Sequence, residues 1–238
     1  MTDSLSVQLS IVIPALNEEK CLADAVATAR QAAAQAGVSC EVIVVNDGST
    51  DNTGKLAAQH ADRVIHHASP IGLGGSFSEG IAAAKGQYVV MVPGDNEVEG
   101  DAIQALFTQF NNADIVTLYP VNPQVRRWYR QWISTFFNGL VRWSSGVALK
   151  YYNGPTMYRT QLVQACLPVS AGFGYNAELL ITLIRGGASF CEIPMHIKFQ
   201  AGRRSRAWRF SNWFQVGATL FKLFLSRFFK GLPKKVSV

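Results

Sequence analysis

Short apolar runs separated by amphipathic segments set the pattern of the first half of the chain. Residues 9–14, 41–46 and 88–92 are almost entirely apolar, and each run is followed by proline or by polar turn residues. Runs of this length and boundary are typical of strands buried on both faces. Residues 63–67 and 114–119 are expected to form two further strands.

Segments with helical spacing of apolar residues alternate with these strands. They span residues 17–36, 51–61, 75–85 and 101–110. This alternation predicts an α/β fold with a Rossmann-like, mostly parallel sheet and helices on both faces. Ligands of such sheets bind at the carboxyl ends of the strands. The loops after Ile13, Val45 and Val92 are therefore the candidate binding loops.

The composition changes after Pro120. Tryptophan, phenylalanine and arginine become frequent, and the expected elements are helices at 126–146, 175–186 and 208–230 and a strand at 190–199. We therefore expect a nucleotide-binding half at about 1–120, an acceptor half at about 121–207, and a basic, aromatic, amphipathic C-terminal helix and tail at 208–238.

The bulk composition limits the class of protein. The chain has 238 residues, 48% hydrophobic and 16% charged, which excludes a disordered protein, and a formal net charge of +6, which favours an anionic partner. No nucleic-acid-binding motif is present. The absence of a signal-like N-terminus and of a long apolar run predicts a cytoplasmic protein with reduced cysteines and no membrane span. Homo-oligomerisation stays open.

Three carboxylates follow the apolar run at 88–92. Asp95, Glu97 and Glu99 alternate along the chain, so an extended segment would place them on one side. Such crowding is repulsive unless a cation is bound, and hard oxygen ligands suit Mg²⁺ or Mn²⁺. A solvated acidic turn is the alternative interpretation.

The loops after the first two strands also carry polar residues. The first reads Pro14-Ala-Leu-Asn-Glu18, which on its own is explained by a strand end and a helix cap at Asn17. The second reads V-N-D-G-S-T-D at 45–51, an ordinary turn composition. At a strand's carboxyl end, however, Asp47 is also able to accept hydrogen bonds from a base or ribose.

Taken together, these motifs are more specific than any one of them. P-x-x-N-E, V-N-D-G-S-x-D, the G-L-G-G run at 72–75 and the acidic triplet resemble the family 2 glycosyltransferases of the GT-A fold. Within that family the chain looks like the dolichyl- and polyprenyl-phosphate sugar synthases, over about residues 9–199. The resemblance implies that a nucleotide-binding set lines the donor site: Pro14, Leu16, Glu18, Asp47, Gly72, Gly74, Arg203, Arg204 and Arg206. It also implies that Asp95, Glu97 and Glu99 lie at the metal.

Further landmarks of that branch follow in the second half. Arg130, Ser134, Asn138 and Arg142 recur every four residues and share one helical face. The resemblance assigns the two arginines to the diphosphate or to an acceptor phosphate, and 174–178 and 192–194 match later motifs. The chain departs from the family pattern at four places: Leu16 replaces an aromatic residue, Asn46 an acidic one and Glu97 an aspartate, and the usual aspartate is not evident around residues 151–154.

The resemblance implies a metal-dependent, inverting transfer from a nucleoside diphosphate sugar to a polyprenyl phosphate or other lipid-linked acceptor. A lipid phosphate needs no general base; a hydroxyl acceptor does, and Glu178 is then the candidate. His66 and His67 are interpreted as structural, and His196 as structural or as a further metal ligand.

Three alternatives remain: a glycosyltransferase with a soluble hydroxyl acceptor, a sugar-phosphate nucleotidyltransferase, and a non-catalytic membrane-binding protein. A nucleotidyltransferase would carry a glycine-rich G-x-G-x-R loop after the first strand, where residues 14–18 stand instead. The basic aromatic segments 126–143 and 208–230 predict peripheral attachment to the cytoplasmic face of a membrane. The alternative is that both helices pack on the core or on another subunit.

Overall fold

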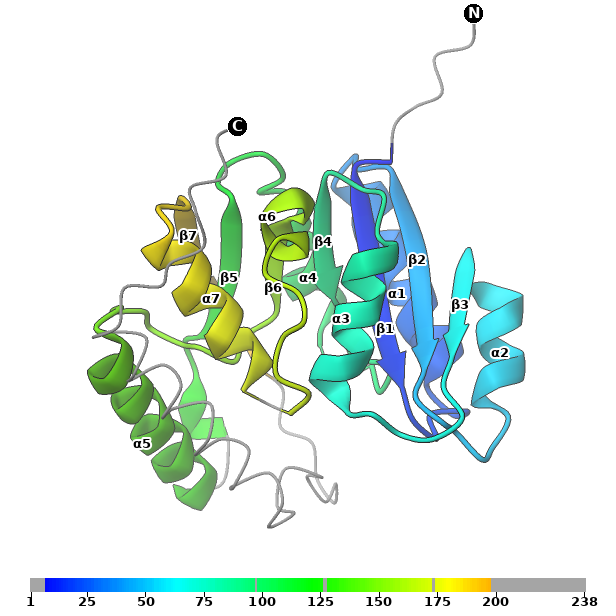
Figure 1. The fold of residues 1–238 in the computed structure, drawn as a ribbon, viewed down its shortest axis with the longest axis horizontal. Helices are drawn as coiled ribbons and strands as arrows, with labels where there is room; N and C mark the ends of the chain where they lie inside the picture. Colours follow the sequence, from blue (N-terminus) through cyan, green and yellow to red (C-terminus); the bar gives the residue numbers. More distant parts are fainter. Residues whose placement is uncertain (1–6, 97, 126–127, 173, 198–238) are drawn as a thin grey trace, which may run out of the picture.

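A single mixed sheet organises the chain in the computed structural model, which describes residues 7–96, 98–125, 128–172 and 174–197 (Figure 1). The strand order is β3-β2-β1-β4-β6-β5-β7. The strands are β1 (Leu9–Ala15), β2 (Cys40–Asn46), β3 (Arg63–His66), β4 (Tyr88–Met91), β5 (Ile115–Pro120), β6 (Thr156–Arg159) and β7 (Phe190–Met195). The five strands expected in the first half and the strand of the second half are all present.

The sheet is parallel except at β6. Strand β1 pairs in parallel with β2 and β4, and β5 pairs in parallel with β7. Strand β6 lies between β4 and β5 and is antiparallel to both. The expected Rossmann-like, mostly parallel sheet is thus confirmed, whereas β6 was not among the predicted elements. Its sequence, TMYR, carries no unbroken apolar run like those that mark β1, β2 and β4.

Helices cover both faces of the sheet, as predicted. Alternate residues of β1 point to opposite faces, with Leu9 and Ile11 in one core cluster and Val12 in the other. The first cluster is closed by α1 (Leu22–Gln35), α2 (Thr53–His60) and α4 (Gly100–Phe107). The second is closed by α3 (Leu73–Ala83), α5 (Trp128–Ser145), α6 (Thr160–Gln164) and α7 (Tyr175–Arg185), and η1 (Pro123–Val125) precedes α5.

Several element boundaries differ from the prediction. Helix α1 begins at Leu22 rather than near Asn17. Asn17 has a φ of 54°, and its side-chain oxygen accepts the Thr50 N–H, so it shapes the loop instead of capping the helix. The predicted C-terminal helix at 208–230 lies outside the described residues. Within the described ranges, no helix has the length and apolar character needed to cross a bilayer.

Close contact between α3 and β1 depends on Gly80. A Cβ atom at this position would lie 2.2 Å from the Cγ1 atom of Val12. Val12 is completely buried under this helix, so its side chain has no room to withdraw. The glycine therefore sets how closely α3 approaches the central strand of the donor half.

We predict that Gly80→Ala lowers the free energy of unfolding by about 1–3 kcal/mol, the usual cost of overpacking a core. Gly139→Ala is the matched control, because a Cβ atom there meets nothing within 4 Å in the middle of α5. The control is expected to gain roughly 0.8–1.0 kcal/mol in helix propensity. Chemical denaturation of the three proteins measures both effects, and an unchanged midpoint for Gly80→Ala contradicts the packing argument.

Candidate active site

The loops that follow β1 and β2 are bound to each other at the carboxyl edge of the sheet. The Asn17 N–H donates to the Ser49 hydroxyl at 3.0 Å, and the Glu18 N–H donates to the Thr53 hydroxyl at 2.8 Å. The Glu19 carboxylate accepts the Asn52 N–H at 3.1 Å. These contacts hold the predicted pocket residues Pro14, Leu16 and Glu18 beside the end of β2 and fix the shape of the edge without a ligand.

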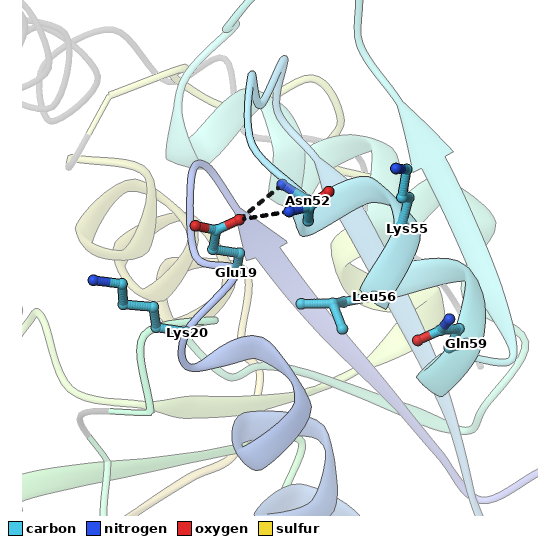
Figure 2. A pocket seen from close by; sticks show the side chains of 6 residues that line it. All are labelled: Glu19, Lys20, Asn52, Lys55, Leu56 and Gln59. Atoms are coloured by element: carbon cyan, nitrogen blue, oxygen red, sulfur yellow. Dashed lines mark hydrogen bonds between the residues drawn. The ribbon is translucent and has the colours of Figure 1, made fainter.

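A shallow hollow of about 580 Å³ lies on the outer side of these loops. Figure 2 shows Glu19 and Lys20 on one side of it and Asn52, Lys55, Leu56 and Gln59 of the α2 region on the other. No described residue that the sequence assigns to the nucleotide lines this hollow. It is therefore a feature of the surface between α1 and α2, separate from the predicted site.

Asp47 joins the end of β2 to the segment that leads into α3. Its Oδ1 accepts the Ile71 N–H at 2.8 Å and faces the Nδ1 atom of His67 at 2.8 Å, while its Oδ2 accepts the Gly72 N–H at 3.0 Å. The side chain is 7% exposed. Asp47 thus holds the loop at 68–72 against the strand end.

The environment of Asp47 favours its charged form. Burial on its own would raise the pKa of this carboxyl group. Hydrogen bonds from Ile71, His67 and Gly72 outweigh that effect and lower the pKa below its usual range. Asp47 is therefore anionic in the folded protein at neutral pH, where it has a structural role. Its contact with a nucleoside stays a prediction.

The glycine run at 72–75 allows a close approach by the chain at 170–171. A Cβ atom on Gly74 would lie 2.0 Å from the Ser170 carbonyl oxygen, and one on Gly72 would lie 2.8 Å from the Ala171 carbonyl oxygen. The Gly74 N–H, at the first turn of α3, donates to that Ala171 oxygen at 2.8 Å. These glycines therefore bring α3 into direct backbone contact with the second half of the chain.

Glu178 fixes the other side of that contact. It lies on α7, is 7% exposed, and accepts the Ser170 N–H at 3.0 Å together with the Ser170 hydroxyl. Its carboxylate is therefore engaged in holding the segment that packs on α3. Its role as a general base stays a prediction.

The acidic segment after β4 forms a turn. The Gly94 N–H donates to the Pro14 carbonyl at 3.3 Å, which ties the segment to the end of β1, and Asn96 has a φ of 54°. The extended arrangement expected for this segment is therefore wrong, because Pro93 and Gly94 open a turn. Asp95 and Glu99 are half-buried, and Glu97 lies outside the described residues.

The donor atoms of this segment suit a hard divalent cation, since carboxylate oxygens are the ligands that Mg²⁺ and Mn²⁺ prefer. Among the described residues, no three His, Cys, Asp or Glu side chains are gathered closely enough to hold a metal ion. Asp95 and Glu99 are the two carboxylates of the predicted triplet that the structure describes. The fit of this segment to a divalent cation therefore rests on their oxygen atoms.

A cavity of about 220 Å³ opens beside the acidic turn. Glu99 and His196 line it, together with Tyr151, Asn153 and Asn176 from the second half of the chain. Its walls therefore come from the loop after β4, the segment before β6, the start of α7 and the end of β7. The cavity is the place where the two predicted halves meet around a carboxylate.

A buried network keeps that wall in place. The Asn176 amide donates to the Tyr152 carbonyl at 2.9 Å and to the Gly154 carbonyl at 3.2 Å, and its oxygen accepts the Tyr158 hydroxyl at 2.6 Å. The network was not foreseen, because it depends on β6, which the sequence pattern does not reveal.

Helix α5 places its polar stripe and its aromatic residues on different faces. Asn138 is half-buried, while Arg142 is exposed and donates to the Leu149 carbonyl at 2.7 Å. The side chain of Arg130 is outside the described part of the chain, as are Arg203, Arg204 and Arg206. Large aromatic side chains stand exposed instead: Trp128, Trp132, Phe136 and Trp143. We call these four residues the aromatic ridge.

Comparisons with known proteins agree with this geometry. The sequence model described as "Glycosyl transferase family 2" matches residues 10–180. Glycosyltransferase GlyG of Streptococcus pneumoniae is 31% identical over 115 residues, which cover 46% of this chain and 37% of that protein. An undecaprenyl-phosphate 4-deoxy-4-formamido-L-arabinose transferase of Edwardsiella ictaluri is 25% identical over 183 residues, which cover 70% of this chain and 54% of that protein. The chain thus spans about a third to a half of these relatives.

Solved structures share the fold. Glucosyl-3-phosphoglycerate synthase from Mycobacterium tuberculosis, solved with Mg²⁺ and uridine diphosphate, superposes with a TM-score of 0.69. Its sequence identity is 22%, and the match covers 95% of this chain and 80% of that chain. The same enzyme solved with Mn²⁺, uridine diphosphate and glucosyl-3-phosphoglycerate gives a TM-score of 0.65. The expected GT-A architecture is confirmed by this likeness.

We predict that Asp47→Asn lowers the free energy of unfolding by about 1–3 kcal/mol at pH 7, because an amide cannot accept all of the hydrogen bonds the carboxylate accepts. Because the pKa of Asp47 is lowered by folding, its carboxylate contributes fully to stability above the pKa of the unfolded state, about 3.9. That contribution is lost as the pH falls through the pKa of the folded state. Denaturation at pH 7 and at pH 3 tests this, with exposed Asp24→Asn as the control. If the difference in the free energy of unfolding between wild type and Asp47→Asn grows as the pH is lowered, the ionised Asp47 carboxylate is not the stabilising group.

Proposed function

The chain belongs to glycosyl transferase family 2, and we propose that it transfers a sugar from a nucleoside diphosphate sugar to a polyprenyl phosphate or related lipid-linked acceptor at a membrane surface. The observation that supports this most directly is the match over residues 10–180 combined with the acidic turn at the end of β4. The donor and acceptor assignments rest on separate features of the two halves.

The donor end is supported by the loops at the ends of β1 and β2. They are bound to each other, and Asp47 holds the loop at 68–72 beside them. Solved neighbours of the same fold carry uridine diphosphate with Mg²⁺ or Mn²⁺. We therefore assign the nucleoside to the edge formed by Pro14, Leu16, Glu18 and Asp47.

A divalent cation is assigned to the acidic turn, with Asp95, Glu97 and Glu99 as its ligands. When bound, such a cation would neutralise the diphosphate leaving group as negative charge develops on it. The positive side chains of Arg130, Arg142 and the segment 203–206 are proposed to add to that stabilisation. The sugar is assigned to the cavity of about 220 Å³ beside Glu99 and His196, where the acceptor attacks the anomeric carbon with inversion.

A phosphate acceptor suits the chemistry of the described site. A lipid phosphate is already anionic and attacks without a general base. The one base candidate from the sequence, Glu178, is engaged with Ser170 and does not belong to the described lining of the cavity. One relative in the comparison is named as an undecaprenyl-phosphate transferase.

The aromatic ridge supports attachment to the cytoplasmic face of a membrane. Trp128, Trp132, Phe136 and Trp143 are 66–74% exposed on α5. At 3.6 residues per turn these positions fall within roughly 80° of the helix circumference. Exposed aromatic residues on one helix face favour the interfacial layer of a bilayer. The ridge would bring a lipid head group to the acceptor half while its tail stays in the membrane.

A soluble hydroxyl acceptor is the second candidate. It is favoured by the presence of His196 in the cavity, since an imidazole is a suitable general base for a hydroxyl acceptor. Transfer of a labelled sugar from the nucleoside diphosphate sugar to a polyprenyl phosphate, compared with its transfer to soluble phosphoglycerate, separates the two candidates.

We predict that Asp95→Asn lowers metal-dependent sugar transfer or sugar-nucleotide hydrolysis at least on the order of 100-fold, because it removes a charge from the cation site. The assay uses a panel of UDP-, GDP- and dTDP-sugars with Mn²⁺. Asp101→Asn, an exposed carboxylate in the first turn of α4, is the matched control and is expected to retain activity. Undiminished turnover by Asp95→Asn would overturn the metal assignment, and inactivity of the wild type on the whole panel would overturn the function.

We also predict that replacing both Trp132 and Phe136 by serine weakens binding to anionic liposomes by about tenfold or more, since burial of one large apolar side chain contributes roughly 1.5–3 kcal/mol. Phe190→Ser, at an exposed aromatic residue of β7, is the control and is expected to bind as the wild type does. Flotation in a density gradient at low salt measures the bound fraction. Wild-type protein that stays at the bottom of the gradient contradicts the membrane assignment.

A further inference from the structure

The ring of His67 lies between two carboxylates that come from different elements. Its Nδ1 atom is 2.8 Å from Oδ1 of Asp47, and its Nε2 atom is 3.1 Å from Oε2 of Glu79. Asp47 follows β2, Glu79 lies on α3, and His67 itself directly follows β3. A single side chain therefore connects three elements at the donor edge of the sheet.

The geometry requires a charged ring. A neutral imidazole has one N–H and one nitrogen lone pair, so it is able to donate to only one of the two carboxylates. The other nitrogen would then face a carboxylate oxygen lone pair to lone pair. Only an imidazolium donates at both distances. The His67 side chain is 8% exposed and its contact with Asp47 is buried, whereas the Glu79 side chain is 49% exposed.

The surroundings of the ring support the same protonation state. Burial on its own would lower the pKa of His67, but hydrogen bonds and charge attraction from Asp47 and Glu79 raise it above its ordinary value near 6.5. The adjacent His66 faces the Asn46 amide instead, at 3.2 Å. Asp47 and Glu79 are thus the charged groups that act on the ring.

The consequence reaches the donor edge through Asp47. The same Oδ1 atom that contacts His67 accepts the Ile71 N–H, and Oδ2 accepts the Gly72 N–H. The loop that these bonds hold also packs on the turn after β2, because a Cβ atom on Gly48 would lie 2.8 Å from the Ser69 carbonyl carbon. Loss of the cation would leave the buried Asp47 carboxylate without a balancing positive charge and weaken its hold on the loop beside the proposed nucleoside site.

We propose that His67, as an imidazolium, is a positioning residue for the nucleotide end of the donor site, with Glu79 setting the pH range over which it acts. The inference rests on the proposed function, because it concerns how tightly the nucleoside diphosphate is held. A ring with a raised pKa stays charged below its ordinary value near 6.5 and loses its charge as pH rises through the folded value. Nucleotide affinity is therefore expected to fall as pH rises through that range.

The test measures the dissociation constant of uridine diphosphate with Mg²⁺ by calorimetry between pH 6 and pH 8.5. The affinity of the wild type for uridine diphosphate is expected to fall on the order of tenfold as the pH rises, a typical coupling between two sites. His67→Gln is expected to bind weakly at every pH, and His67→Arg, which keeps a permanent cation, to bind without this pH dependence. Glu79→Gln removes a charge from the half-exposed partner and is expected to move the transition to lower pH. The nucleotide's own phosphate also titrates in this range, but it affects all four proteins equally. Differences between their pH profiles therefore report the protein.

A second measurement does not depend on the ligand. Nitrogen-15 chemical shifts of labelled histidine, assigned with His67→Gln, report whether the His67 ring is doubly protonated at pH 7. A neutral ring overturns the proposal. So does a wild-type pH profile identical to that of His67→Gln, and in that case nucleotide binding itself still stands. Absence of binding by the wild type to uridine, guanosine and thymidine diphosphates overturns the proposed function and the positioning role with it.

Discussion

Parallel pairing of β1 with both β2 and β4 is the constraint on which the candidate site depends. Parallel strands end at the same edge of a sheet, so the loops after these three strands must meet there. The Asp47 N–H donates to the Ala15 carbonyl, and the Gly94 N–H donates to the Pro14 carbonyl, which continues the strand pairing into the loops. Residues far apart in the sequence therefore reach one edge without any contribution from a ligand.

Two close backbone contacts join this edge to the second half of the chain. The Gly74 N–H donates to the Ala171 carbonyl, and a Cβ atom on Gly72 or Gly74 would collide with the carbonyl groups at 170–171. Glu178 holds Ser170 on the opposite side of the contact, while Asp47 holds Ile71 and Gly72. One buried carboxylate thus binds each of the two segments that meet at the glycine contact. This arrangement explains why both carboxylates are almost fully buried although both were expected at the ligand.

The sequence pattern predicted the parts of the fold that have strong local signals. Buried strands such as β1 and β2 are unbroken apolar runs, and their ends mark the binding loops. Strand β6 escaped prediction because its sequence, TMYR, lacks an unbroken apolar run and its place is set by its partners β4 and β5. The engagement of Glu178 with Ser170 and the position of His67 between two carboxylates also escaped prediction, because both depend on how separate elements and loops pack together. Turn geometry at Asn17 and Asn96, both in the left-handed region, also depends on tertiary contacts rather than on residue type alone.

Helix α5 has an orientation that is unusual for a helix whose outer face contacts only water. A helix on the surface of a soluble protein turns its apolar stripe to the core and its polar residues outward. Here Val141 is buried, but Trp128, Trp132, Phe136 and Trp143 face outward, while Asn138, on the polar stripe, has a buried side-chain oxygen without a hydrogen-bond partner in the described part of the protein. Exposing several large aromatic residues together in water forgoes the burial that would stabilise each by roughly 1.5–3 kcal/mol. The helix therefore presents an apolar outer face, and this exposed face is the observation that supports the proposed attachment to a membrane.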